Sequence, residues 1–152
     1  MSKDTFDCDH FLSLSNGELI DYTEPFVTTQ ADKVPCSVYE TLANKLDELS
    51  DTHVVYALEI CMRIAPQEFA SQAVEFLSHS DPSVNCTAYR VIESLPPEFV
   101  SSALVKRIAE TPVVDLITSH VRTGERVKIG TNEEVVRELL DKFKGELSSG
   151  SD

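Results

Sequence analysis

The 152-residue sequence repeats itself at an offset of thirty positions, and this repeat restricts the folds open to the chain. Ser-Asp-Thr-His-Val at residues 50–54 aligns with Ser-Asp-Pro-Ser-Val at residues 80–84. At the same offset, Pro-Gln-Glu-Phe-Ala-Ser-Gln-Ala-Val at 66–74 aligns with Pro-Pro-Glu-Phe-Val-Ser-Ser-Ala-Leu at 96–104. Periods of this length are typical of stacked structural repeats, in which each unit buries its apolar face against its neighbours.

Each repeat is expected to form two helices joined at a proline. Ser-Asp is good N-cap chemistry, and Pro82 falls in the first helical turn, where a missing N–H costs nothing. Pro66 and Pro96 are expected to end the first helix and start the second, because the residue before a proline is pushed out of the α region. The second helices are then expected to bury Phe69 and Phe99 as equivalent aromatic anchors.

The pattern extends in both directions, less regularly. Residues 36–49 match the second helix of an earlier unit, and residues 113–117 are expected to begin a further first helix. Residues 123–130 would then form a short hairpin or an irregular loop. A Thr-x-x-Glu capping box from Thr131 to Glu134 predicts the last helix, followed by a disordered tail at 148–152.

Residues 1–34 are expected to form an atypical, helical capping segment. One short helix would stop near Asn16 and Gly17, and Ser15 would cap another that ends before Pro25. A β-hairpin that turns at Asn16 and Gly17 is the competing assignment.

The sequence Leu-Ser-His-Ser-Asp-Pro-Ser-Val at 77–84, continuing to Ala88, Ile92 and the Pro96 turn, resembles a HEAT-like repeat of the short phycobilisome-lyase type. The resemblance implies an all-α fold, a short right-handed α-solenoid of stacked antiparallel helix pairs. It would form one domain over 1–147, with units at 35–49, 50–79, 80–109 and 110–147. The chain departs from the usual pattern at Asn85, where arginine is common, and in its proline turns.

Acidic residues outnumber basic ones by 26 to 13, which gives a net charge of −13. Residues 1–81 contain 15 acidic and four basic residues, so most of the excess lies in the N-terminal half. Such a surface repels nucleic acid and anionic membranes and attracts a basic protein. The competing explanation is that the charge serves only solubility.

No catalytic motif is recognisable, and we expect neither an enzyme nor a bound cofactor. There is no glycine-rich phosphate loop and no nucleophile elbow. The cysteines, Cys8, Cys36, Cys61 and Cys86, are isolated, which predicts free thiols and no metal site. With neither an apolar run of about 18 residues nor an apolar leader, a cytoplasmic location is expected.

The exposed positions of the second helices are the candidate partner-binding residues, since second helices usually line the concave face of a solenoid. They are Tyr39, Glu40, Asp47, Glu48, Glu68, Gln72 and Glu75. Acidic side chains around a tyrosine suit recognition of lysine and arginine. The alternative is a solvated face that contacts nothing.

The expected function is therefore that of a small stoichiometric inhibitor or immunity protein, acting as a monomer or heterodimer. Its acidic face would cover the basic cleft of a nuclease-like toxin, and charge would speed the association. A general HEAT-repeat adaptor or chaperone-like subunit is the alternative. A lyase-type enzyme, suggested only by the resemblance, is a distant third.

Overall fold

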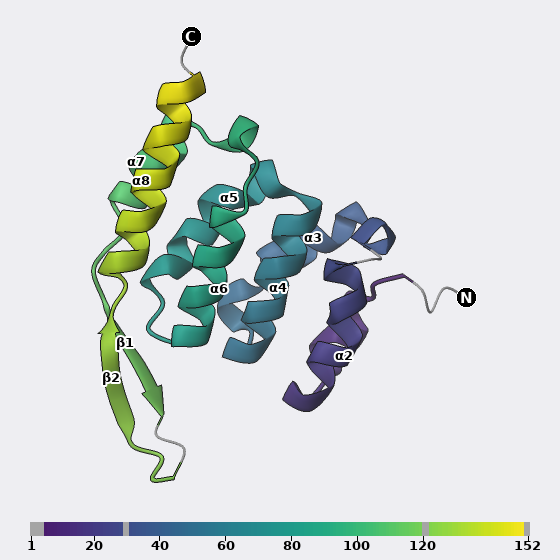
Figure 1. The fold of residues 1–152 in the computed structure, drawn as a ribbon. Helices are drawn as coiled ribbons and strands as arrows, with labels where there is room; N and C mark the ends of the chain where they lie inside the picture. Colours follow the sequence, from purple (N-terminus) through teal and green to yellow (C-terminus); the bar gives the residue numbers. More distant parts are fainter. Residues whose placement is uncertain (1–4, 29–30, 120–121, 151–152) are drawn as a thin grey trace. The chain divides into compact units, whose positions relative to one another are not determined.

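The computed structural model describes residues 5–28, 31–119 and 122–150 (Figure 1). These residues form eight α-helices, four short 3₁₀ helices and one two-stranded sheet, so the fold is mostly helical. The chain divides into two compact units, Met1–Phe69 (unit 1) and Ala70–Asp152 (unit 2). The boundary falls within helix α5 (Pro66–Val74) and therefore inside the 50–79 repeat.

Unit 1 begins with α1 (Cys8–Ser13) and α2 (Asn16–Val27), as the helical assignment predicted. The backbone N–H of Ser15 donates to the Glu18 carboxylate over 3.1 Å, so Asn16 and Gly17 lie in the first turn of a capped helix and not in a hairpin. The expected end of this helix before Pro25 was wrong, since α2 continues to Val27. Proline in the last turn forfeits one backbone hydrogen bond while its φ still fits the helix.

The rest of unit 1 comprises η1 (Ala31–Lys33), α3 (Cys36–Ala43), η2 (Leu46–Glu48) and α4 (Asp51–Ile64), followed by the start of α5. Both α2 and α3 pack against α4. The apolar stripe predicted for residues 51–64 faces the core, with Leu58 and Ile60 fully buried. Near the N-terminus the Phe6 ring lies 5.4 Å from Phe11 and 5.3 Å from Phe26, forming an aromatic cluster.

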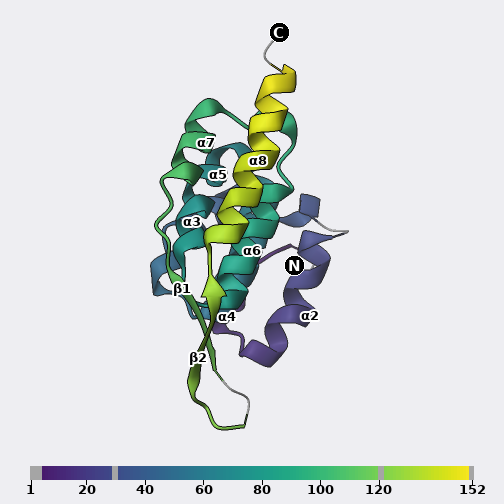
Figure 2. The same cartoon turned by 60° about the vertical axis from the view of Figure 1, so that its left-hand side comes forward.

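Unit 2 contains η3 (Glu75–Ser78), α6 (Pro82–Glu93), η4 (Pro97–Phe99) and α7 (Ser102–Ala109), then strands β1 (Asp115–Ser119) and β2 (Arg126–Thr131) and helix α8 (Glu133–Gly150). Helix α8 packs against α6 and α7 (Figure 2). It continues to Gly150, where the sequence predicted a tail from residue 148. Residues 151–152 lie outside the described part of the chain.

The second repeat differs from the first in where its second helix starts. Residues 97–99 form a 3₁₀ turn, and α7 is capped by Ser101, whose hydroxyl accepts from the Leu104 N–H over 3.1 Å. Phe69 lies inside α5 and is fully buried, as predicted. Phe99 lies in the turn and is only half-buried, so its assignment as an equivalent anchor was wrong. Two consecutive prolines delay the helix, because neither supplies an N–H.

The helix predicted after Pro112 was also wrong, since this segment forms β1. The strand and the two residues before it contain four β-branched residues, Val113, Val114, Ile117 and Thr118, which favour extended backbone. Strand β1 pairs antiparallel with β2. The hairpin predicted as one possibility for 123–130 is therefore real and larger than expected.

The hairpin contains one irregularity near its base. Leu116 pairs with Gly130 and Ile117 pairs with Lys128, which leaves Ile129 as an extra residue on β2. Gly130 has a φ of 149°, a conformation that residues with a Cβ rarely adopt. In Figures 1 and 2 the hairpin extends beyond the helices of unit 2. Val127 and Ile129 are 40% and 57% exposed.

A buried asparagine joins the hairpin to the helices of unit 2. Asn132 is fully buried, and its Nδ2 donates to the carbonyl oxygens of Leu77 and Pro112, each over 2.8 Å. Its Oδ1 accepts from the Val114 N–H over 2.9 Å. Asn85 also donates to the Leu77 carbonyl, so this oxygen at the end of η3 has two amide partners. This network provides hydrogen-bond partners for buried polar groups that would otherwise destabilise the fold.

Candidate partner-binding surface

Unit 1 carries most of the net negative charge of the chain. It contains 13 acidic and four basic residues, a net charge of −9, whereas unit 2 contains 13 acidic and nine basic residues, a net charge of −4. The exposed carboxylates of unit 1 belong to Asp7, Asp9, Glu18, Asp21, Glu24, Asp32, Glu40, Asp47, Glu48, Asp51 and Glu68. A field of one sign over a single compact unit steers oppositely charged partners toward it.

Five of the seven predicted binding residues lie in unit 1. Tyr39 and Glu40 are on α3, Asp47 and Glu48 are on η2, and Glu68 is in the first turn of α5. All four of these acidic side chains are exposed, as the helical periodicity predicted.

Tyr39 is half-buried, although the sequence predicted an exposed side chain at this position. Its ring lies edge-on to Phe69, with centroids 6.0 Å apart and planes at 86°. Burial raises the pKa of Tyr39, with smaller contributions from the neighbouring Cys61 thiol and Glu68 carboxylate. Unit 1 thus brings Tyr39 and Glu68 close together, and the tyrosine stays neutral beside a carboxylate.

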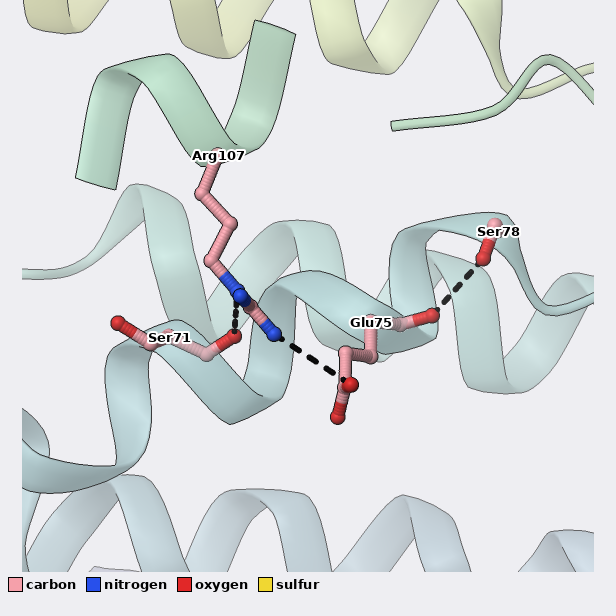
Figure 3. A network of polar contacts seen from close by, with 4 residues as sticks. All are labelled: Ser71, Glu75, Ser78 and Arg107. Carbon is pink, nitrogen blue, oxygen red and sulfur yellow. Dashed lines mark hydrogen bonds and ion pairs between the residues drawn. The ribbon is translucent and has the colours of Figure 1, made fainter. Parts of the chain in front are cut away.

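The remaining two predicted residues, Gln72 and Glu75, lie in unit 2. Gln72 is half-buried, whereas the Glu75 side chain is 61% exposed. Glu75 forms an ion pair with Arg107 of α7, with 3.4 Å between Oε1 and Nη2. Figure 3 shows Arg107 reaching from α7 to α5 and η3, where its Nε also donates to the Ser71 carbonyl oxygen over 2.9 Å. One predicted partner contact is therefore already engaged within unit 2.

This ion pair lies at the side of a small groove in unit 2. The groove has a volume of about 350 Å³ and is lined by Val74, Glu75, Ser78, Arg107, Glu110, Thr111 and Pro112. Glu110 is exposed and caps the C-terminal end of α7. The Thr111 Oγ1 is buried and has no hydrogen-bond partner among the described residues. Sequence reasoning missed this groove, because Arg107 and Ser71 are 36 positions apart and no spacing rule pairs them.

A second polar cluster in unit 2 joins α6 to α8. The Tyr89 hydroxyl lies 2.5 Å from a Glu93 oxygen and 2.9 Å from a Glu138 oxygen. The hydrogen bond to Glu93 raises the pKa of Tyr89, and desolvation and Glu138 raise it further. Lys142 of α8 donates to the Glu93 carbonyl oxygen over 2.5 Å. These contacts hold α8 against α6, and the Tyr89 phenol stays protonated between the two carboxylates.

A serine and a histidine meet in unit 1, in an arrangement that explains local structure better than catalysis. Ser50 Oγ lies 2.7 Å from His53 Nδ1, and the same oxygen accepts from the His53 backbone N–H over 3.2 Å. Ser50 is the N-cap of α4, so this contact caps the start of the helix.

Residues 5–28, 31–119 and 122–150 contain neither a metal-binding cluster nor a membrane-spanning helix. No group of three or more histidine, cysteine, aspartate or glutamate side chains in this part of the chain is placed to hold a metal ion. No helix in it combines the length and apolar character needed to span a membrane.

Comparisons with protein-family models, with curated proteins and with solved structures each gave no match to this chain.

Proposed function

We propose that this chain is a protein-binding module that recognises a basic protein through the acidic surface of unit 1. The observation that supports it best is the excess of acidic over basic residues there, a net charge of −9, with Glu68 near the half-buried Tyr39. The proposed scaffold is a HEAT-like solenoid of helix pairs, as the thirty-residue repeat suggests. The most favoured form of the proposal is a stoichiometric inhibitor, or immunity protein, of a nuclease-like toxin.

The charge supports an inhibitory role through the kinetics of association. A nuclease needs a basic cleft to bind the phosphate backbone of its nucleic-acid substrate. An acidic inhibitor surface has the charge complementary to such a cleft. Complementary charge raises association rates by about 10- to 1,000-fold at low salt, and a protective inhibitor needs rapid capture. Tyrosine is enriched at the energetic centres of interfaces, and Tyr39 is held in place by Phe69.

The test compares two triple charge reversals that change the net charge equally. One combines Glu40→Lys, Glu48→Lys and Glu68→Lys in unit 1, and the control combines Glu98→Lys, Glu125→Lys and Asp141→Lys in unit 2. All six side chains are exposed. The chain is immobilised, and a basic protein that it retains from an extract of the host is purified. The rate at which this protein associates with each variant is then measured at low and at physiological salt.

The unit 1 reversal should slow association by about tenfold or more at low salt, while the control stays within a few-fold of the unchanged protein. A retained nuclease should lose its activity at one equivalent of the chain. Equal slowing by both reversals would mean that the net charge of the whole chain, and not the surface of unit 1, determines the association rate. A retained protein that remains fully active would exclude inhibition.

An adaptor that joins two proteins is the second candidate, and the hairpin favours it. Val113, Val127 and Ile129 are large, exposed apolar residues in or beside the hairpin of unit 2. Exposed apolar clusters commonly mark contact surfaces. An adaptor would need such a surface in addition to the acidic one, whereas a simple inhibitor would not.

A further inference from the structure

The groove of unit 2 already contains one arginine, and its contacts show how a guanidinium is recognised there. Arg107 donates through Nε to the Ser71 carbonyl oxygen and pairs through Nη2 with the Glu75 carboxylate (Figure 3). The two paired side chains are 46% and 61% exposed. Exposed ion pairs contribute little to stability, so this pair can be exchanged for another at small cost.

The rest of the groove offers further groups that suit a cation. Glu110 adds a second carboxylate at the C-terminal end of α7, where the helix dipole also places partial negative charge. Thr111 adds a buried hydroxyl oxygen for which the described part of the chain provides no hydrogen-bond partner. A buried hydroxyl without a partner destabilises the fold, and a guest could donate a hydrogen bond to this oxygen once the groove wall moves enough to expose it.

The size and the apolar walls of the groove fit one side chain. Its volume of about 350 Å³ is near the lower limit of the about 300–1,000 Å³ that is typical of ligand sites. The exposed Pro112 supplies apolar surface for an aliphatic stem, above the buried Val74 in the lining of the groove. An anion fits poorly, because the two carboxylates outnumber the single guanidinium, which is already engaged.

We infer that this groove binds an arginine side chain of the basic partner, and that Arg107 occupies its carboxylate until the partner displaces it. The inference rests on the proposed function and adds a defined subsite to it. A guanidinium is preferred to an ammonium because its planar fork donates to several acceptors at once, here Glu75, Glu110 and the Thr111 hydroxyl. Arg107 is therefore an intramolecular competitor that weakens binding of the incoming arginine.

The experiment uses the full chain labelled with ¹⁵N and titrates it with N-acetyl-arginine N-methylamide. Saturable shifts are expected at the amides of Ser78, Glu110 and Thr111. The matched probe is N-acetyl-citrulline N-methylamide, which has nearly the same shape and no charge, and it should leave these amides unchanged.

Three variants test the roles of individual groups. Glu110→Gln and Thr111→Val should weaken binding of the arginine probe, whereas Arg107→Gln should strengthen it by about two- to fivefold, the effect of removing one exposed ion pair. Lys106→Gln is the control, since Lys106 is an exposed cation on the same helix that does not line the groove. Thermal unfolding of each variant confirms that it is folded.

Two results would overturn the inference. Equal shifts with the citrulline probe would mean that charge is not recognised, and weaker binding by Arg107→Gln would make Arg107 part of the receiving site. Binding of a deca-arginine peptide to the full chain distinguishes failure of the groove inference from failure of the proposed function. If it binds and only the unit 1 reversal weakens it, the groove is excluded and the acidic surface stands. If it does not bind at all, both fail.

Discussion

The Asn132 side chain donates a hydrogen bond over 2.8 Å to the carbonyl oxygen of Leu77, a residue 55 positions earlier in the chain. This contact connects the segment between β2 and α8 to the end of η3. Asn132 also satisfies Pro112 and Val114, and it is fully buried. It therefore determines where the hairpin departs from the helices of unit 2.

Replacing Asn132 by alanine should destabilise unit 2 by about 2–4 kcal/mol, because each buried group left without a partner costs roughly 1–3 kcal/mol. Urea denaturation monitored by circular dichroism measures the change. Asn44→Ala is the control, since Asn44 is exposed and a surface change of this kind stays within about 0.5 kcal/mol. Equal midpoints for the two variants would show that the buried network contributes nothing.

The two aligned phenylalanines should differ in their contribution to stability. Phe69→Ala should cost about 3–5 kcal/mol, the range for a fully buried aromatic residue. Phe99→Ala should cost clearly less, because Phe99 is half-buried in a 3₁₀ turn. Chemical denaturation of both variants tests the difference. Similar losses would restore the equivalence that the sequence suggested.

Two glycines should respond to alanine in opposite directions. Gly130→Ala should destabilise the hairpin by about 1–3 kcal/mol, because a φ of 149° is strained for a residue with a Cβ. Gly145 lies in α8 with open space around it, so Gly145→Ala should stabilise the protein by about 0.5–1 kcal/mol. Melting temperatures of the two variants and the unchanged protein test both expectations. An unchanged melting temperature for Gly130→Ala would contradict the backbone conformation at the bulge.

The Cys61 thiol should make stability fall at alkaline pH. Burial raises the pKa of Cys61 from 9.0 to about 12, with a smaller contribution from Cys8. A pKa raised by folding gives a contribution that is complete below pH 9 and is lost as the pH rises toward 12. Denaturation from pH 8 to 11 should therefore show a shallower decline for Cys61→Ala than for the unchanged protein.

Alkylation of the native protein checks the same burial independently. Iodoacetamide should modify the exposed Cys86 and spare the buried Cys61, as peptide mapping by mass spectrometry would show. Addition of urea should expose Cys61 to the reagent. Modification of Cys61 at the rate of Cys86 in the folded protein would be inconsistent with the packing of α4.

The helices were predictable where local signals agreed with one another. Ser50, Pro66 and a continuous apolar stripe define α4 and the start of α5, and Ser15 with Glu18 defines α2. Strand β1 was missed because residues 113–117 follow a proline in repeat register, which favoured a helix. Its strand conformation depends on Asn132 and β2, contacts that are distant in sequence.

Periodicity identified which acidic side chains are exposed but not what they contact. Glu40, Asp47, Glu48 and Glu68 are exposed as predicted. The pairing of Glu75 with Arg107 depends on how α7 lies beside η3, and no rule of sequence spacing contains that information. The same is true of Tyr39, whose ring packs on Phe69 from another helix.

The bond between Asn132 and Leu77 also orders events during protein synthesis. Leu77 is translated 55 residues before the side chain that pairs with it, so the contacts of Asn132 and α8 with the earlier helices of unit 2 cannot form until this last part of the chain has been made. All of unit 1 has been translated by then, including every residue of its compact core. A nascent chain stalled before Asn132 would therefore expose the surfaces of α6 and α7 that α8 covers in the finished protein.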